Sequence, residues 1–522
     1  MLAPLQRLLL ASAAAAGLVR AAGADSTPSL VDDAEVGEGF IRFPVHASRS
    51  RSPLDDDEGG GNSSATRRRD VTEVLLRARQ AEVALDNLQD GTIYSINLGI
   101  GTPAQRVEVI IDTGSSELWV NPDCTRSSSR RFCDQFPKYT TSRSSTVKDA
   151  SSTGFIQYGK GNVTLRYIAD TITIGSGTKI RDQIFGFATS SYDIPMGILG
   201  LSPKLGSRSV DYPFVLDSLA KQGQIKSRAF SLDLRSVDSP SGAVIFGGVD
   251  TTKFIGSLAK LPILRPSDTP RGADRYYVYM TSLTVTAADG KSTNAFLSAS
   301  TSSGEPVFLD SGGTLSRLPA AMFRAIGESF PGARYDRATG FYVVSCSVRD
   351  TSGTVDFGFG TGSSAKRIRV SFADFIWRAS GVTCVLGVLP IESDRGESVL
   401  GASFLRAAYV VYDQDNRNIH LAQAANCGSQ GISSIGTGTD AVPSATGRCT
   451  ATPTRGGSKP TLSGDGEGCT NCDGSGMFTT TVPGRPGATG SSSKNNAAGR
   501  ANEGLGGVMV ASGLALLFVC MS

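Results

Sequence analysis

The chain has 522 residues and a formal net charge of +3, with 61 glycines, nine cysteines and only two histidines. A chain of this length can bury one large core or two moderate ones, and so small a net charge predicts no nucleic-acid partner. His46 and His420 are too few for the histidine-rich shells of most catalytic zinc sites, and a serine or cysteine hydrolase would depend on one of these two imidazoles. We therefore expect no metal site and no cofactor, and a hydrolase of this composition would work without histidine.

Two amino-terminal segments are expected to be removed from the mature chain. Residues 1–24 have the layout of a secretory signal peptide, because Arg7 precedes a 12-residue apolar run, 8–19, that small residues follow. Such a run is too short to span a bilayer as a helix. Residues 25–69 are polar, weakly patterned and end in three arginines, 67–69. This ending is typical of a pro-peptide with a processing site, and the alternative is a solvated charge cluster.

The segment from Thr92 to about Ala425 is predicted to be mainly β structure. It consists of short apolar runs, many of them alternating with polar residues, between turns rich in Gly, Asn, Asp and Pro. Helical patterns are few, and 215–222 and 320–330 are the examples. The clearest strand candidates are 94–98, 107–111, 170–174, 243–246, 276–280 and 409–412.

Two further features suit the surface of a secreted protein. Gly, Ser, Thr and Pro dominate residues 427–496, which contain few large apolar side chains. Such a segment buries too little surface to offset the entropy of ordering, so we expect a flexible stalk open to O-glycosylation. Asn62 and Asn162 begin N-x-S/T triplets and are candidates for N-glycosylation.

The carboxyl-terminal end matches a signal for a glycosylphosphatidylinositol (GPI) anchor. The apolar run 508–521 has only 14 residues, and no basic residue follows it. Small residues and a polar spacer precede this run, which is the order found in GPI signals. Asn496 is the expected attachment residue, Asn495 is the next choice, and 497–522 would be removed. A short membrane helix or a core segment is the alternative.

Secretion places the cysteines in an oxidising compartment. Eight cysteines are left after Cys520 departs with the tail, and they could form four disulfides. Cys469 and Cys472 have the spacing of a redox or zinc motif, but they lie in a Gly/Ser/Thr stretch. A local disulfide between them, or pairing with Cys427 or Cys449, is therefore favoured, and the choice between these pairings stays open.

An internal repeat indicates two similar lobes. An apolar strand that ends in Asp-Thr-Gly at Asp112 recurs as one that ends in Asp-Ser-Gly at Asp310. Each copy is followed by two apolar residues and a glycine, at Gly200, 88 residues after the first aspartate, and at Gly401, 91 residues after the second. Matching order and nearly matching spacing predict that each lobe contributes one aspartate. The expected lobes are residues 70–258, which include a leading segment, and residues 259–426.

Two aspartates in facing turns can hydrolyse a substrate without histidine or metal. Backbone N–H groups and hydroxyls can bond the carboxylates, and two carboxyl groups close together hold one proton between them. The ionised member can deprotonate a water while the protonated member donates to the scissile carbonyl oxygen. The candidate catalytic residues are Asp112 and Asp310, and the turn residues expected to support them are Thr113, Gly114, Ser115, Ser311, Gly312 and Gly313.

Residues 92–425 resemble the pepsin-like aspartic proteases through several separate motifs. Residues 111–120 are similar to the first catalytic motif of that family, 308–314 to the second, and 399–413 to the closing segment of the second lobe. The resemblance implies a mainly β, bilobal fold with an active-site cleft between two β-rich lobes, and aspartic endopeptidase activity. The stalk and GPI signal add a resemblance to the yapsin-like members that fungi anchor at their surface.

The segment 155–161 is similar to the flap hairpin, which in this family closes over the substrate. On that resemblance Tyr158 is the flap tyrosine, Gly159 and Lys160 lie at the flap tip in the substrate cleft, and Trp119 is the hydrogen-bond partner of the tyrosine. Lys160 stands where the family more often has a small or acidic residue. The disulfides that the resemblance implies are Cys346–Cys384 and Cys124–Cys133.

Two departures from the family pattern concern the aspartates. Gly313 stands where the family usually has Thr or Ser, so a hydroxyl that would bond the second carboxylate is missing. Ala402 stands where many members have Asp, which removes a negative charge from the neighbourhood. Asp310 has thus lost a bond that favours its ionised form, and we expect it to carry the shared proton.

The leading hypothesis is a secreted, zymogen-derived aspartic endopeptidase that a GPI anchor holds on the extracellular face of the plasma membrane or in the cell wall. It would act as a monomer on protein or peptide substrates. The alternative is a silent binding or wall-structural protein on the same scaffold, but both Asp-[Thr/Ser]-Gly motifs are intact. A serine hydrolase that uses His420 is disfavoured, because this residue lies in a strand-like stretch where a half-exposed histidine is expected.

Overall fold

The structure is a computed structural model that describes residues 35–49, 92–159, 161–174, 178–204, 211–236, 241–298, 303–361, 365–380, 382–391, 396–428 and 431–450. All of them belong to the first of two compact units, Met1–Pro460. The predictions that fall outside the described residues concern the signal peptide 1–24, Asn62, Lys160, Cys469, Cys472, Asn496 and the GPI signal 497–522.

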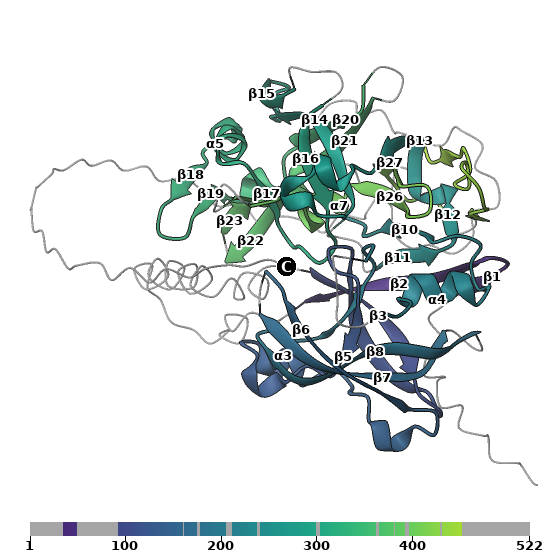
Figure 1. Ribbon diagram of the computed structural model, residues 1–522. Helices are drawn as coiled ribbons and strands as arrows, with labels where there is room; N and C mark the ends of the chain where they lie inside the picture. The colour runs from purple at the N-terminus through teal and green to yellow at the C-terminus, as the bar shows by residue number, and fades with distance from the viewer. Residues whose placement is uncertain are drawn as a thin grey trace, which may run out of the picture. The chain divides into compact units, whose positions relative to one another are not determined.

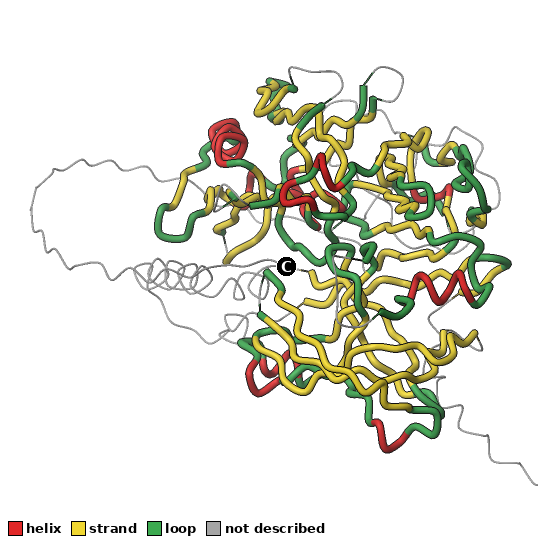
Figure 2. Tube along the Cα trace, viewed as in Figure 1, coloured by secondary structure: helices red, strands yellow, loops and turns green. Residues whose placement is uncertain are grey.

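Strands dominate the described residues, as the sequence predicts (Figure 1, Figure 2). The largest sheet has 15 strands. Its order is β29 (Thr446–Arg448), β13 (Phe254–Pro262), β27 (Asn418–Ala424), β26 (Ala408–Asp413), β10 (Ala229–Asp233), β11 (Ser241–Phe246), β2 (Phe40–Arg49), β3 (Thr92–Ile100), β4 (Gln105–Asp112), β9 (Gly197–Gly200), β5 (Leu118–Val120), β8 (Thr178–Tyr192), β7 (Asn162–Ile174) and β6 (Lys148–Gln157), with β1 (Glu35–Gly37) beside β2.

Three smaller sheets complete the strand structure. One is the pair β12 (Gly248–Asp250) and β28 (Ile432–Ser434). An eight-stranded sheet has the order β21 (Lys366–Ser371), β20 (Thr354–Phe359), β14 (Tyr277–Thr286), β16 (Glu305–Leu309), β25 (Ser398–Leu400), β17 (Ser316–Leu318) and β24 (Val388–Pro390), with β15 (Ser292–Leu297) beside β14. The last has the order β18 (Arg334–Asp336), β19 (Phe341–Ser345), β23 (Thr383–Leu386) and β22 (Ile376–Ser380).

The helices of the described residues are short (Figure 2). The two helices that the sequence predicts, 215–222 and 320–330, are confirmed to within one residue at their ends. The α-helices are α3 (Arg130–Cys133), α4 (Val215–Lys221), α5 (Ala320–Ser329), α6 (Phe372–Phe375) and α7 (Ala402–Leu405).

The two lobes share their central strands. Figure 1 shows β3–β8 in one lobe and β14–β23 in the other, with β10, β11 and β26 between them. Alternation buries one side of β4, where Val107, Val109 and Ile111 are at most 2% exposed, whereas β10 and β26 are buried on both sides. The same hydrophobic cluster continues to Phe230 on β10 and Tyr412 on β26, whose rings stack at 4.7 Å. The fold is therefore the predicted bilobal β structure, but the last strands of the second lobe pair directly with the sheet of the first.

The predicted pro-peptide, 25–69, contributes a central strand. β2 pairs with β11 on one side and with β3 on the other. Ile41, Phe43 and Val45 alternate along it and are at most 2% exposed, and the Phe43 ring meets that of Phe246 edge to face at 5.8 Å. This part of the predicted pro-peptide is thus fully integrated into the sheet.

The predicted start of the stalk at residue 427 is wrong. Residues 431–450, which we call the carboxyl-terminal extension, form β28 and β29 and pair with β12 and β13. Ile435 and Val442 within it are 0% and 5% exposed, and a disulfide joins Cys427 to Cys449. Few apolar residues are enough here, because the disulfide lowers the entropy lost on ordering the segment.

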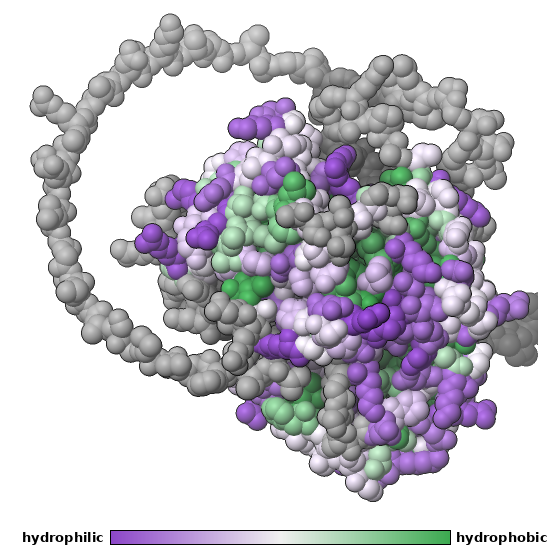
Figure 3. All heavy atoms as spheres, turned by 45° about the horizontal axis from the view of Figure 1, so that its top comes forward, coloured by the Kyte–Doolittle hydropathy of each residue, from purple (hydrophilic) through white to green (hydrophobic). Residues whose placement is uncertain are grey.

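Five large hydrophobic side chains are exposed in the described part of the chain. On the face seen in Figure 3, hydrophilic residues are interspersed with small hydrophobic groups. Among the described residues, the structure has no helix that is long and apolar enough to cross a membrane. The exposed large hydrophobic residues are Phe155, Tyr192, Leu297, Tyr335 and Val382.

His420 differs from its expected half-exposed state. It lies on β27 opposite Val411 and Lys260, and only 7% of its surface is exposed. Burial, with a smaller contribution from Lys260, lowers the pKa of His420 from 6.5 to about 4. This histidine is neutral in the folded protein at any pH above about 5, and it takes no part in the site described below.

His420→Gln is expected to improve stability at acidic pH. Because the pKa of His420 is lower in the folded than in the unfolded chain, folding stability is lost as the pH falls from about 6.5 to about 4. The substitution should raise the free energy of unfolding at pH 4.5 by roughly 2 kcal/mol more than at pH 7.5. Urea unfolding at both pH values, with the disulfides intact, measures this difference, and an equal effect at both pH values contradicts the expectation.

Candidate active site

The two Asp-[Thr/Ser]-Gly turns follow two equivalent strands. β4 runs parallel to β9 and ends with Asp112 opposite Gly200. β16 runs parallel to β25, with Leu309 opposite Leu400, and Asp310 follows directly. Each apolar-apolar-Gly step of the sequence repeat therefore lies beside its own motif strand. The two lobes thus repeat the same strand pairing as well as the same sequence pattern.

Crossed hydrogen bonds join the two turns. The Thr113 hydroxyl donates to the Leu309 carbonyl and the Ser311 hydroxyl donates to the Ile111 carbonyl, both at 2.8 Å. Each hydroxyl also accepts from the opposite backbone: Ser311 N–H donates to Thr113 Oγ1 at 2.9 Å, and Thr113 N–H donates to Ser311 Oγ at 3.1 Å. All four bonds are buried, so they fix the position of one turn against the other.

Each motif glycine packs against the opposite aspartate. A Cβ atom on Gly114 would lie closer than 3.0 Å to Asp310 Oδ1. A Cβ atom on Gly312 would lie closer than 3.0 Å to Asp112 Oδ1. The two carboxyl groups thus meet across the two glycines, and the absence of side chains at these positions is what permits the approach.

The two carboxyl groups have different hydrogen-bond partners. Asp112 is 7% exposed and accepts from Gly114 N–H at 2.8 Å and from the Ser115 hydroxyl. Asp310 is half-buried and accepts from Gly312 N–H at 2.9 Å. The hydroxyl on the Asp112 side has no equivalent at Gly313, which is the asymmetry expected from the sequence.

The surroundings of Asp310 favour the protonated form of its carboxyl group. Burial, and next the charge of Asp112, raise the pKa of Asp310 from 3.8 to about 8. Arg275 opposes this rise. Its guanidinium pairs with Glu397 at 3.2 Å and lies 5.2 Å from the centre of the Phe308 ring. The direction agrees with the role of proton carrier expected for Asp310, although burial rather than the missing hydroxyl is the main cause.

Gly313→Thr is expected to move the alkaline limb of the pH-rate profile to lower pH. A Cβ atom at this position would lie 3.5 Å from Asp310 Oδ2, so a threonine fits and its hydroxyl can reach the carboxylate. Such a bond favours the ionised form and should lower the pKa of Asp310 by about one unit. Initial rates of peptide hydrolysis from pH 3 to about 9 measure the limb, with Gly313→Ala as the control that adds only the Cβ. A profile that superimposes on the wild type contradicts the account.

The flap of the family resemblance is the hairpin of β6 and β7. Tyr158 N–H donates to the Gly161 carbonyl at 3.0 Å and closes this hairpin. Trp119 Nε1–H donates to the Tyr158 hydroxyl at 2.8 Å, as the resemblance implied. Burial, and next the charge of Asp112, raise the pKa of Tyr158 far above its ordinary value. Gly159, at the tip, is exposed and a Cβ there would meet no atom within 4 Å.

Glu117 carries a buried carboxylate beside the flap, and the sequence indicated neither its burial nor its partners. The Glu117 carboxylate accepts hydrogen bonds from the hydroxyls of Tyr167 and Tyr212 at 2.6 and 2.7 Å. Glu117 belongs to the first motif, but no pattern in the sequence indicates that these two tyrosines, 50 and 95 residues away, would meet it.

Comparisons with known proteins agree with this geometry. A family model described as eukaryotic aspartyl protease matches residues 93–424. The chain belongs to that family. The probable aspartic-type endopeptidase opsB of Aspergillus oryzae is 34% identical to this protease over 385 residues, which cover 71% of this chain and 76% of the relative. Yapsin-3 of Saccharomyces cerevisiae is 32% identical over 351 residues, 64% of this chain and 66% of the relative.

The fold of this protease also matches a solved structure. The crystal structure of the aspartic proteinase from Irpex lacteus superimposes with a TM-score of 0.51 at 25% identity and covers 63% of this chain and 94% of that one. Family, relatives and fold together show that the chain is an aspartic-type endopeptidase.

The disulfides of the protease include both that the resemblance implied. Cys124 pairs with Cys133 in the loop after the first motif, and Cys346 pairs with Cys384 in the second lobe. The third pair described is Cys427–Cys449, which settles two of the four cysteines left open by the sequence.

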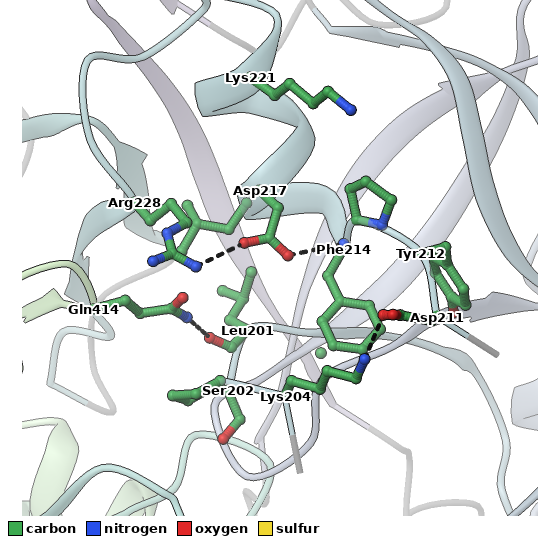
Figure 4. A pocket seen from close by; sticks show the side chains of 14 residues that line it. Leu201, Ser202, Lys204, Asp211, Tyr212, Phe214, Asp217, Lys221, Arg228 and Gln414 are labelled. Atoms are coloured by element: carbon green, nitrogen blue, oxygen red, sulfur yellow. Dashed lines mark hydrogen bonds and ion pairs between the residues drawn. The ribbon is translucent and has the colours of Figure 1, made fainter. Parts of the chain in front are cut away.

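A pocket of about 550 Å³ lies behind the first motif of the protease (Figure 4). The two aspartates are not among the residues that line it. Its charged side chains are largely paired with one another: Arg228 Nη1 lies 3.1 Å from Asp217 Oδ1, and Lys204 pairs with Asp211. Tyr212, one of the two tyrosines bonded to Glu117, forms part of its wall.

Proposed function

We propose that this protease is secreted and held at the cell surface, where Asp112 and Asp310 hydrolyse protein or peptide substrates with an activated water. The observation that carries the catalytic proposal is the set of crossed bonds between Thr113 and Ser311, which holds two carboxyl groups together. Of the two, Asp310 has a pKa of about 8. Asp310 therefore keeps its proton over the acidic and neutral range.

The asymmetry assigns a role to each carboxyl group. Asp112, stabilised as an anion by Gly114 N–H and the Ser115 hydroxyl, takes a proton from the water that attacks the scissile carbonyl. Asp310 donates its proton to the carbonyl oxygen, so that the tetrahedral intermediate carries no full negative charge. The proton on Asp112 then passes to the leaving amine as the C–N bond breaks, and Asp310 regains a proton from the intermediate.

The hairpin of β6 and β7 would close over the substrate in this reaction. Tyr158 lies close enough to Asp112 for the charge of this carboxylate to raise the pKa of the tyrosine, and its hydroxyl is held by Trp119. Gly159 at the exposed tip leaves space for a peptide backbone. Lys160 belongs to the same tip in the sequence, and its role in choosing substrates is part of the proposal.

Surface anchoring rests on the two ends of the sequence. Residues 1–24 would direct secretion, 451–496 would form the stalk, and a GPI lipid would replace 497–522 at Asn496. Release of the protease from intact cells by phosphatidylinositol-specific phospholipase C tests this directly. Retention on the cells after this treatment would exclude the anchor. Loss of surface protease in Asn496→Gln together with Asn495→Gln, but not in Asn495→Gln alone, would support Asn496 as the attachment residue.

Processing after residues 67–69 would cut the chain beyond β2. Removal of this strand would expose the backbone edges of β3 and β11, which are otherwise paired on that side. The pro-peptide therefore leaves only if another strand takes its place. Mass spectrometry of the purified surface protease shows whether residues 35–49 remain bound after the cut.

The same measurement shows whether Asn162 on β7 carries a glycan.

A further inference from the structure

Alternate residues of the first motif reach three different partners. Ser115 donates to the Asp112 carboxylate, Glu117 accepts from two tyrosines, and Trp119 donates to Tyr158. Trp119 lies on β5, and Ser115 and Glu117 lie in the segment directly before this strand. Residues 115–119 thus connect Asp112 with the flap tyrosine, and Glu117 lies in the middle of this segment.

The Glu117 carboxylate is held in a fixed place. Glu117, Tyr167 and Tyr212 are 2%, 3% and 7% exposed, and both tyrosine hydroxyls donate to the same oxygen, Oε2. The two tyrosine rings lie 5.6 Å apart. A buried carboxylate is costly without donors, and hydrogen bonds to a charged group are stronger than neutral ones. Moving Glu117 would therefore break bonds that water does not replace.

The backbone of Glu117 is restrained as well. Its carbonyl accepts from Gly200 N–H at 3.0 Å, and a Cβ atom on Gly200 would collide with the Glu117 nitrogen. The loop is therefore pinned by β9 on one side and by the two tyrosines on the other.

The tyrosines belong to the structure that carries the flap. Tyr167 lies on β7, the second strand of the flap hairpin, and Tyr212 lines the pocket behind the motif (Figure 4). Both are in one hydrophobic cluster with Trp119 and with Ile156 of β6, and Tyr158 packs against this cluster. Any shift of Glu117 is thus transmitted to the indole that holds the flap tyrosine.

We propose that Glu117 is a positioning residue of the flap. By fixing β5 against β7 and the Tyr212 segment, it sets the place of the Trp119 indole and so the hydrogen bond from Trp119 to Tyr158. This inference rests on the proposed role of the flap in the reaction.

Glu117→Gln is the first test. The amide keeps one oxygen that can accept from both tyrosines, but it removes the charge that strengthens these bonds and adds an N–H₂ group that needs an acceptor among buried partners. We expect kcat for peptide hydrolysis to fall about tenfold with a smaller change in KM, since a misplaced group costs transition-state binding. Tyr212→Phe, which removes one donor, should give a smaller loss in the same direction, and it serves if Glu117→Gln does not fold.

A double-mutant cycle with Tyr158→Phe separates positioning from general stability. If Glu117 acts through the bond between Trp119 and Tyr158, then Glu117→Gln should lower kcat by less than about twofold once the Tyr158 hydroxyl is gone. Losses that multiply would overturn the proposal, as would an unchanged kcat in Glu117→Gln. Asp170→Asn is the matched control, because Asp170 is another buried carboxylate of this lobe that accepts from a tyrosine, Tyr139. It should lower stability and leave kcat within about twofold.

A spectroscopic readout does not depend on turnover. The chain has two tryptophans, Trp119 and Trp377, so 5-fluorotryptophan labelling should give two ¹⁹F resonances, which Trp377→Phe assigns. Glu117→Gln and Tyr158→Phe should each shift the Trp119 resonance, and Asp170→Asn should not. An unmoved resonance in Glu117→Gln overturns the inference even if the wild type cleaves peptides. If the wild type cleaves no peptide while the resonance moves, the proposed function fails and the coupling of Glu117 to Trp119 stands.

Discussion

Gly312→Ala is expected to lower kcat/KM for peptide hydrolysis by at least about a hundredfold in a protein that still folds. The added Cβ would lie closer than 3.0 Å to Asp112 Oδ1 and 3.2 Å from Asp310 Oδ1, so it occupies the space through which the two carboxyl groups meet. Asp112 has no freedom to move aside, because Gly114 N–H and the Ser115 hydroxyl hold its carboxylate. The geometry of the pair must therefore change, and displacements of about 1 Å at reacting groups cost about two orders of magnitude.

Two further variants test whether the loss in Gly312→Ala comes from the position of the added Cβ. Gly114→Ala should be similarly damaging, since its Cβ would lie 2.7 Å from Asp310 Oδ1. Gly313→Ala adds the same methyl group one residue further on, where the nearest atom is at 3.5 Å, and should cost less than about tenfold. Steady-state kinetics with circular dichroism as the check on folding measures all three. Equal losses in Gly312→Ala and Gly313→Ala would contradict the packing argument.

Asp310→Asn is expected to abolish hydrolysis and to stabilise the protein at neutral and alkaline pH. The pKa of Asp310 is raised to about 8 in the folded chain, so between pH 4 and about 8 the folded state binds a proton that the unfolded state does not. Stability is then lost as the pH rises through this window, with a slope of at most about 1.4 kcal/mol per pH unit for one proton. An asparagine needs no proton, and its unfolding free energy should lack this slope.

Unfolding by urea at several pH values tests this prediction. The gain of Asp310→Asn over the wild type should be largest near pH 8 and should shrink as the pH falls towards 4. Asp268→Asn is the matched control, because Asp268 is an exposed carboxylate of the same lobe, and it should leave the slope unchanged. A gain for Asp310→Asn that is independent of pH would show that Asp310 is ionised in the folded protein. The raised pKa of Asp310 therefore lowers the free energy of unfolding of the wild type at neutral and alkaline pH.

The sequence predicted the centre of the site well because that centre is encoded twice. Two Asp-[Thr/Ser]-Gly turns with nearly equally spaced glycines left few arrangements other than two facing lobes. The crossed bonds, in which Thr113 and Ser311 reach the opposite backbone rather than a carboxylate, were not predicted. The disulfides and the bond from Trp119 to Tyr158 came from the family resemblance rather than from spacing.

Features that depend on long-range packing escaped prediction. Tyr167 and Tyr212 meet Glu117 only because β7 and the segment before α4 fold against the same motif. The carboxyl-terminal extension has the composition of a stalk, but its few apolar side chains and the Cys427–Cys449 disulfide bind it to β12 and β13.

The polar composition of residues 25–69 likewise hid the strand β2. Residues 25–69 are polar on average, and this average hides the alternation of Ile41, Phe43 and Val45 that makes β2 a central strand. A window of five or six residues carries the strand signal, and the surrounding charged residues dilute it.

Cleavage of peptides by the secreted protein, compared with Asp112→Asn and with pepstatin added to the wild type, tests the central claim most directly. We expect hydrolysis that is blocked by pepstatin and that falls by at least about four orders of magnitude in Asp112→Asn, since the water then has no base. Hydrolysis that survives both the substitution and the inhibitor would contradict the assignment of the reaction to Asp112 and Asp310.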